Sequence, residues 1–388
     1  MPNCATSRLV LGPYSEDVVV ETARDALREI GGKVTCGFVF VSADYAQHLS
    51  DFLELLQLHA HIPVLTGCSG LGLVAAGREE EHASGFSFVL LHLPETQLYP
   101  VRLPGLSEEG ELNTARLREL AGPGAEHCTG WIVFANPYTL PVEPWLDAWN
   151  AAFPGVPALG GLASGGPRGD TAFVFHEREL IEGGVALGFS GGVSLRSIVS
   201  QGCRPVGEPF TITGAEGHLV TTLGSRPAYE VLDQTFGALP PKDRARAQGN
   251  LFVGLAMSEY LEEFKTGDFL VRNLIGGDPQ AGVLAVGALP RVGQTLQFQL
   301  RDRTSADVDL RHLIDALRVE GSAPFASLVF ACSGRGRNLF GDRHHDALAL
   351  AEGFGPHASA GFFCNGEIGP VGFRNFIHGY TVSVALFC

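Results

Sequence analysis

Three segments of this chain repeat one plan: an apolar strand, an amphipathic helix, a proline, a second short strand and a run of glycines. The first strand of each segment ends in phenylalanine. The glycine run follows after 27, 27 and 31 residues, measured from Phe40 to Gly67, from Phe134 to Gly161 and from Phe330 to Gly361. A helix has to end before a proline. Each segment therefore predicts a strand–helix–strand unit, which normally joins parallel strands by a right-handed crossover.

An extended apolar stretch follows each unit, at residues 86–91, 184–189 and 379–387, and residues 249–300 are rich in β-type sequence interrupted by glycine. We therefore expect an α/β fold with mixed β-sheets flanked by helices, built from repeated strand–helix–strand units in two halves. With 388 residues, 45% of them hydrophobic, the chain can fill two cores. Its two predicted domains are residues 1–215 and 216–388.

The net charge and the cysteine spacing argue against several classes of partner and site. The formal net charge of −15 argues against partners such as nucleic acid or an anionic membrane surface. None of the eight cysteines forms a Cys-x-x-Cys pair, which disfavours a zinc ribbon or a thioredoxin-type motif. The sequence shows no signal-peptide pattern and no apolar run near the roughly 18 residues of a membrane span. We expect a cytoplasmic protein with free thiols.

A small-molecule site is predicted by two loops in the last quarter of the chain. Residues 328–331 form an apolar strand that stops at the small-residue loop 332–336, which carries a thiol, a hydroxyl and a guanidinium. Ligands bind at the ends of strands in α/β proteins, and arginine offers a planar fork to carboxylate or phosphate. A second glycine-punctuated loop, 361–370, adds the carboxylate of Glu367.

We expect Arg335 to pair with an anionic group of the ligand and Glu367 to accept an ammonium, so that the two together would read both ends of an amino acid. A structural salt bridge of Arg335 with Glu367 or Asp342 is the competing interpretation. Charge reversal at Arg335 is expected to abolish binding and leave the fold intact. The predicted ligand-binding residues are Cys332, Ser333, Gly334, Arg335, Gly336, Gly361, Asn365 and Glu367, with Cys68 and Ser69 reaching in from the other half.

Two other functions stay open. An enzyme could use Cys332 or Cys364 as a nucleophile on an acyl or related electrophile, with His378 as the base, although no known nucleophile signature is present. A haem-binding gas sensor would need an axial ligand among thirteen histidines, none of which stands out. The pair His344-His345 is explained by a polar loop before a helix, so no metal site is expected, and no cofactor either.

Several of these motifs resemble the FIST family. They are Gly67-Cys68-Ser69-Gly70, Arg272-Asn273-Leu274-Ile275-Gly276, the segment from Gly282 to Gly287, Cys332-Ser333-Gly334-Arg335-Gly336, the segment from Gly361 to Pro370, and His378-Gly379-Tyr380-Thr381. The resemblance implies an N-terminal and a C-terminal FIST domain. It also implies a sensory, intracellular module for small ligands such as amino acids, in a family that includes haem-binding members.

FIST-like sequence uses nearly the whole chain, so we expect no F-box and no output domain. A signal would then pass through a separate partner protein. The sequence thus favours a binding protein over an enzyme: a sensor of a small polar or anionic metabolite, without a nucleic-acid or membrane partner.

Overall fold

The computed structural model describes residues 2–106, 113–165, 171–261, 263–321 and 323–388, and its chain forms two compact units. The first comprises the residues up to 199 together with 310–377 and 381–388, and the second comprises 200–309 and 378–380. The domain boundary predicted at 215 and 216 falls at the end of strand β14 (Cys203–Glu216). The compact units divide the chain at other residues, so the two domains predicted from the sequence stay a prediction.

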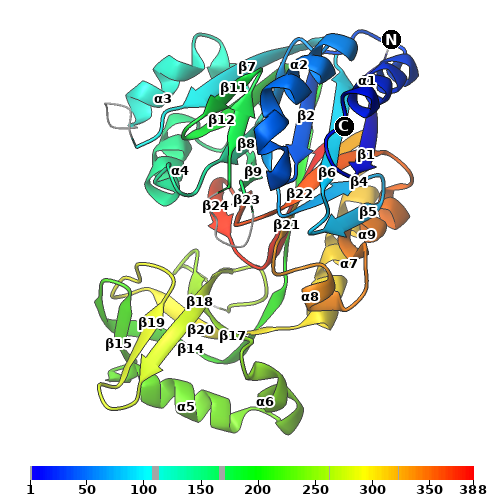
Figure 1. Cartoon of the computed structure of the whole chain (residues 1–388). Coiled ribbons are helices and arrows are strands. Elements are labelled where there is room, and N and C mark those ends of the chain that lie inside the picture. The colour runs from blue at the N-terminus through cyan, green and yellow to red at the C-terminus, as the bar shows by residue number, and fades with distance from the viewer. Residues whose placement is uncertain (1, 107–112, 166–170, 262, 322) are drawn as a thin grey trace. The chain divides into compact units, whose positions relative to one another are not determined.

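Within its described residues, the first unit contains three six-stranded sheets with one common strand order (Figure 1). The first sheet is β1 (Cys4–Leu11), β6 (Gly85–His92), β2 (Cys36–Val41), β3 (Leu65–Ser69), β10 (Val174–His176) and β11 (Glu179–Ile181). The second is β7 (Thr96–Leu103), β12 (Gly184–Gly191), β8 (Gly130–Ala135), β9 (Ala158–Leu162), β23 (Glu367–Val371) and β24 (Arg374–His378). The third is β13 (Leu195–Gln201), β25 (Thr381–Phe387), β21 (Ala326–Cys332), β22 (Ala358–Cys364), β4 (Gly72–Ala75) and β5 (Arg78–Glu81).

The middle of each sheet is a parallel strand pair joined by a helix. The joining helices are α2 (Leu49–His59, preceded by the 3₁₀ turn Ala43–His48), α4 (Val142–Ala152) and α9 (His345–Phe354, preceded by α8, Arg337–Phe340). The pairs are β2 with β3, β8 with β9, and β21 with β22. The mixed α/β fold predicted from the three segments is therefore confirmed.

The hairpin that follows each parallel pair does not stay in its own sheet. Hairpin β4–β5 joins the third sheet, β10–β11 joins the first and β23–β24 joins the second. The registers place Val74 opposite Gly361, Phe175 opposite Gly67 and Ile368 opposite Gly160. Each sheet is completed by strands from another segment, so the three segments form one folding unit.

The predicted glycine loops at residues 67–69 and 361–364 are in fact strand. Gly67 lies in β3 and Gly361 in β22, and the matching residue of the second sheet is Gly160, one position before the Gly161 used in the sequence comparison. A Cβ at Gly67, Gly160 or Gly361 would lie 1.7, 1.8 or 1.9 Å from the carbonyl oxygen of the valine opposite it, Val39, Val133 or Val329. These glycines allow the paired strands to approach closely.

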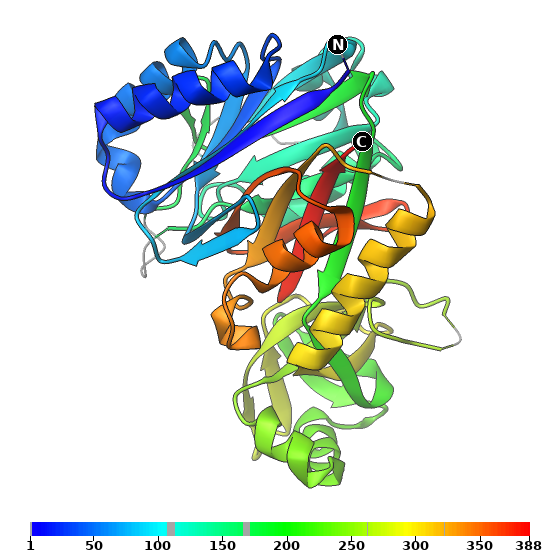
Figure 2. The same cartoon turned by 90° about the vertical axis from the view of Figure 1, so that its right-hand side faces the viewer.

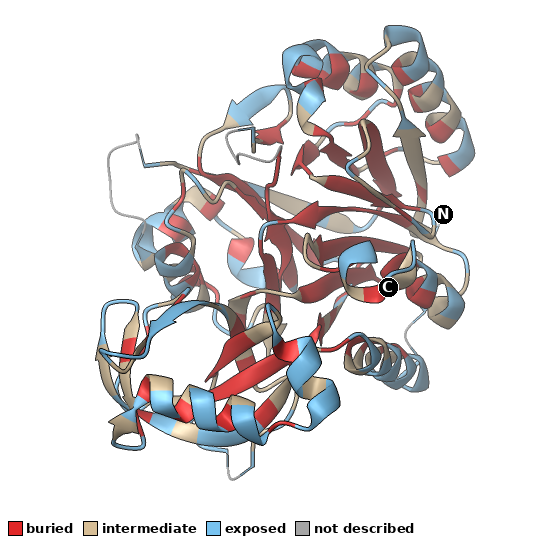
Figure 3. Ribbon diagram, turned by 60° about the horizontal axis from the view of Figure 1, so that its bottom comes forward, coloured by how far each residue is buried: buried red, intermediate tan, exposed pale blue. Residues whose placement is uncertain are grey.

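The inner faces of the three sheets share one core, in which Phe40, Phe134, Phe330 and Phe362 meet. The ring centroids of Phe40 and Phe134 are 5.4 Å apart, and those of Phe134 and Phe330 are 6.0 Å apart. Helices cover the outer faces: α1 (Glu16–Ile30, Figure 2) and α2 on the first sheet, α3 (Thr114–Ala121) and α4 on the second, and α9 with the part of α7 (Arg303–Val319) from Leu310 on the third. Figure 3 shows the resulting buried strands and half-exposed helices.

The second unit is an antiparallel sheet that closes on itself, because β14 pairs with both β20 and β15. Its order is β14, β20 (Thr295–Arg301), β17 (Leu251–Ala256), β18 (Phe269–Asp278), β19 (Val283–Val286), β15 (Leu219–Leu223) and β16 (Arg226–Pro227). Helices α5 (Ala228–Ala238) and α6 (Pro241–Ala247) accompany it. No helix among the described residues of the chain combines the length and the hydropathy needed to cross a bilayer.

Candidate functional site

Strands β21 and β22 end at two cysteines, Cys332 and Cys364, which lie directly opposite each other in the parallel register. Of the predicted loop 332–336, Cys332 is still strand, and residues 333–336 follow and are folded by backbone hydrogen bonds. Ser333 N donates to the carbonyl oxygen of Cys364 (3.1 Å), and Arg335 N donates to that of Cys332 (2.8 Å). Gly334 N donates to Cys332 Sγ at 3.4 Å. The thiol of Cys332 is half-buried, whereas that of Cys364 is buried.

Glu367 brings a fully buried carboxyl group to these thiols. Cys364 Sγ donates to its Oε1 and Thr381 N to its Oε2, each at 3.2 Å, and the Cys332 side chain also hydrogen-bonds to it. Burial raises the pKa of Glu367 to about 8, because these bonds and the charge of Arg335 offset only part of the lost hydration. Burial likewise raises the pKa of the Cys364 thiol.

Arg335 is fully buried and forms a two-pronged ion pair with Asp346, its Nε 2.7 Å from Oδ2 and its Nη2 2.8 Å from Oδ1. Burial opposes ionisation of Asp346, but the charge and hydrogen bonds of Arg335, helped by His345, bring the pKa of Asp346 down to about 2. Arg335 is thus paired with Asp346, a partner that the sequence did not suggest, and its charge also acts on Glu367. One edge of the guanidinium, formed by Nε and Nη2, is occupied by the carboxylate of Asp346. Contact of Arg335 with a ligand stays a prediction.

Two histidines and a glutamate surround this ion pair at the start of α9. Glu79 Oε1 accepts a hydrogen bond from Ala347 N (2.9 Å), and burial, together with the charge of Asp346, raises the pKa of Glu79 to about 8. His344 Nδ1 lies 2.8 Å from the carbonyl oxygen of Glu79, and His345 Nδ1 lies 3.0 Å from Asp346 Oδ1. His344 caps α9 and His345 is its first residue. Among the described residues, no group of three or more His, Cys, Asp or Glu side chains is arranged to hold a metal ion.

The remaining predicted site residues are placed elsewhere. Cys68 belongs to the apolar core, and Ser69 Oγ accepts a hydrogen bond from Phe173 N (2.9 Å). Asn365 is exposed, with its Nδ2 3.3 Å from the carbonyl oxygen of Ala163. His378, considered as a base for the thiols, is the last residue of β24, where the chain passes from the first unit to the second. The structure therefore gathers Cys332, Cys364, Glu367 and Arg335, and the contacts of Cys68, Ser69 and Asn365 are to other residues.

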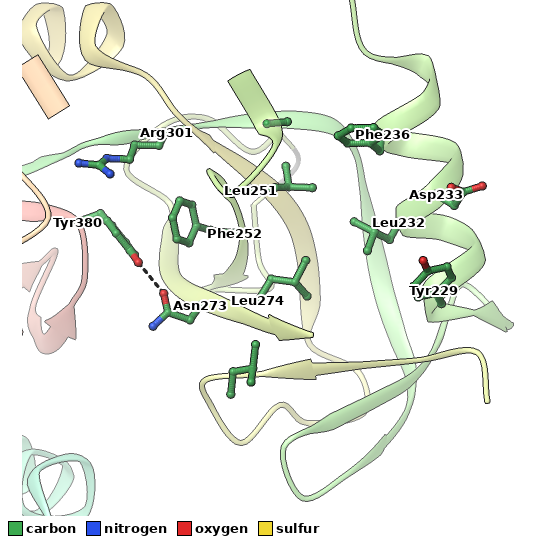
Figure 4. Close-up of a pocket in the computed structure, with 13 residues that line it drawn as sticks. Tyr229, Leu232, Asp233, Phe236, Leu251, Phe252, Asn273, Leu274, Arg301 and Tyr380 are labelled. Atoms are coloured by element: carbon green, nitrogen blue, oxygen red, sulfur yellow. Dashed lines mark hydrogen bonds between the residues drawn. The ribbon is translucent and has the colours of Figure 1, made fainter. Parts of the chain in front are cut away.

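A pocket of about 810 Å³ opens in the second unit (Figure 4). Tyr380 Oη donates to Asn273 Oδ1 at 2.6 Å, and the ring centroids of Tyr380 and Phe252 are 4.2 Å apart. The lining residues come from α5, α6 and the neighbouring strands and loops: Tyr229, Leu232, Asp233, Phe236, Ala247, Gly249, Leu251, Phe252, Asn273, Leu274, Ile275, Arg301 and Tyr380.

This pocket was not predicted from the sequence, although two signals for it were present. The segments Arg272–Gly276 and His378–Thr381 both carry the family resemblance, and each supplies lining residues. They are far apart in the chain, and the hydrogen bond from Tyr380 to Asn273 brings them together.

Residues 35–226 match the model of the FIST N domain and residues 228–370 match the model of the FIST C domain. The chain belongs to the FIST family. The resemblance inferred from the motifs is thus confirmed. FIST domains are generally sensory domains that bind small ligands in signalling proteins.

Similar proteins occur in mycobacteria. The chain is 33% identical over 377 residues to Rv0628c, an uncharacterized protein of Mycobacterium tuberculosis strain H37Rv, with 97% of each chain covered. It is 35% identical over 389 residues to Mb0898c, an uncharacterized protein of Mycobacterium bovis, with 97% of this chain and 96% of the relative covered.

Among solved structures, a cyanuric acid hydrolase from A. caulinodans aligns with this FIST protein over 99% of each chain, at 10% sequence identity and a TM-score of 0.35. A second cyanuric acid hydrolase aligns with a TM-score of 0.32, also at 10% identity. At this level of similarity, nothing about the activity of the present chain follows.

Proposed function

We propose that this FIST protein is a sensor that holds a small anionic or zwitterionic metabolite, such as an amino acid, in the pocket of the second unit and passes the signal to a separate protein. The observation that supports this most is that two family motifs meet at the pocket, where the Tyr380 hydroxyl donates a hydrogen bond to the amide oxygen of Asn273. Membership of a family of small-ligand sensors fits the same function.

The lining of the pocket suits such a ligand. Its volume of about 810 Å³ lies within the range of small-molecule sites, roughly 300–1,000 Å³. Arg301 offers a planar cation for a carboxylate or phosphate, and Asp233 on α5 adds a carboxylate that can face an ammonium. The aromatic rings of Tyr229, Phe236 and Phe252 add apolar surface for the body of the ligand.

The test is calorimetric titration of the whole chain with a panel of amino acids and small carboxylates, followed by Arg301→Gln. Loss of a charge-assisted hydrogen bond should weaken binding by about tenfold or more. Arg303→Gln is the matched control, because Arg303 is exposed and lies outside the lining. Wild-type affinity in a folded Arg301→Gln variant, or no binding of any panel member to the wild type, would overturn the proposal.

A further inference from the structure

The two thiols at the ends of β21 and β22 are close enough to react with each other. Neighbouring strands are about 4.8 Å apart, and disulfides form over Cα separations of about 4.4–6.8 Å. Cys332 and Cys364 are register partners, so their side chains lie on the same face, and both hydrogen-bond to the carboxyl group of Glu367. Each is the last residue of its strand. A small movement of two strand ends is therefore enough to join the sulfurs.

The other two sheets provide an internal comparison. In the second sheet, Glu367 lies opposite Gly161 in the strand register. The equivalent position is held by Val174 in the first sheet, opposite Cys68, and by Leu73 in the third sheet, opposite Phe362. The positions matching the two thiols are also occupied by other residues, Ser42 and Gly70 in the first segment and Asn136 and Ala163 in the second. The same sheet architecture is therefore built without thiols or a buried acid at these positions, and the fold itself does not require the cluster.

We propose that Cys332 and Cys364 are a reactive dithiol that reduces a hydroperoxide and closes to an intramolecular disulfide, with Glu367 as the acceptor of a thiol proton. The Cys332 thiolate attacks the peroxide, an S–O bond forms, the O–O bond breaks, and an alcohol or water leaves. Cys364 then gives its proton to Glu367 and attacks the sulfur of the Cys332 sulfenic acid; an S–S bond forms, the S–O bond breaks, and the hydroxide takes that proton from Glu367 and leaves as water. Both thiols are oxidised, and the hydroperoxide takes up the two electrons.

The surroundings of the two cysteines indicate which thiol reacts with the peroxide first and which one closes the disulfide. Cys332 is half-buried and its Sγ accepts a hydrogen bond from the N–H of Gly334, so it is the thiol of the two that a peroxide can reach. Cys364 is buried beside it and donates to Glu367 Oε1, so its proton has an acceptor 3.2 Å away. The charged or titratable groups that act most strongly on Glu367 are Cys364, Arg335 and Cys332. Because Glu367 titrates near pH 8, disulfide closure should accelerate as the pH rises through that range.

The experiment uses the full chain, reduced and then treated with one equivalent of hydrogen peroxide, with the disulfides mapped by non-reducing peptide mass spectrometry. We expect one Cys332–Cys364 cross-link. Cys364→Ser should leave a sulfenic acid on Cys332 that a dimedone reagent traps. Glu367→Gln should slow the closure by roughly tenfold or more. Cys388→Ser, which removes another half-buried thiol, should leave the rate of closure unchanged.

The disulfide map of the oxidised wild-type protein tests the proposal even where a variant fails to fold. Oxidation of Cys4 or Cys388 with Cys332 and Cys364 still reduced would overturn it, and so would equal closure rates in the wild type and a folded Glu367→Gln variant. Ligand binding in the second unit is measured separately, so either idea can fail without the other.

Discussion

Arg335 and Asp346 form a fully buried, two-pronged ion pair, with Nε–Oδ2 and Nη2–Oδ1 distances of 2.7 and 2.8 Å. The arginine sits in the loop after β21 and the aspartate in the first turn of α9, so the pair fastens the loop to the helix. A buried pair of this kind adds little relative to apolar packing, but removing one partner takes the directly paired counter-charge from a buried ion.

We therefore expect Asp346→Asn to lower the free energy of unfolding by about 3–5 kcal/mol. The control is Arg374→Met, which breaks an exposed ion pair with Asp147 of the same 2.7 Å length and should cost at most about 1 kcal/mol. Urea unfolding of the three proteins gives both values. Equal losses of unfolding free energy in the two variants would contradict the argument that burial makes the Asp346 substitution the more costly one. Arg335→Glu should prevent folding, because it would bury two carboxylates together, in contrast to the intact fold expected from the sequence.

The buried acid Glu367 predicts a pH dependence of stability. Its pKa is raised from the ordinary 4.5 to about 8, so between these values the folded state holds a proton that the unfolded state has lost. The contribution is complete below about pH 4.5 and is lost as the pH rises through 8. In urea unfolding from pH 5 to 9, Glu367→Gln should show a smaller decline in stability than the wild type. Parallel curves would show that this group does not titrate as described.

Gly361 should not tolerate a side chain. Its Cβ would lie 1.9 Å from the carbonyl oxygen of Val329, and two backbones of one sheet cannot separate locally without losing their hydrogen bonds. We expect Gly361→Ala to destabilise the protein by about 3 kcal/mol or more. Gly237→Ala in α5, where no atom lies within 4 Å of the new Cβ, should be neutral or gain up to about 1 kcal/mol. Thermal unfolding distinguishes the two, and similar melting temperatures would refute the close-contact argument.

The hydroxyl of Tyr380 should matter to the pocket of the second unit. Tyr380→Phe removes the donor that holds Asn273 Oδ1 at 2.6 Å, so the amide loses its fixed orientation. For any ligand found in the panel titration, we expect a loss of about threefold to tenfold in affinity with a stability cost near 1 kcal/mol. Tyr260→Phe is the control, since Tyr260 is 97% exposed. Unchanged affinity in Tyr380→Phe would argue against a ligand contacting Asn273.

Local sequence patterns were sufficient for the three strand–helix–strand segments of the first unit. An apolar run ending in phenylalanine, followed by an amphipathic helix and a proline, determines a strand–helix–strand segment, because each signal acts over a few residues. The loop after Cys332 and the helix after His345 were found in the same way. The glycines were misread, because a glycine that lets two strands approach and a glycine in a loop look alike in sequence.

The sequence by itself determined the strand–helix–strand segments, the family and the strand end where Cys332 lies. Tertiary structure alone decided the rest: the exchange of hairpins among the sheets, Asp346 as the partner of Arg335, Glu367 beneath both thiols, and the pairing of Asn273 with Tyr380. The physical reason is distance along the chain. Hydrogen bonding and helix periodicity are local, whereas the partner of a buried charge or an edge strand is set by which distant segments pack together and exclude water.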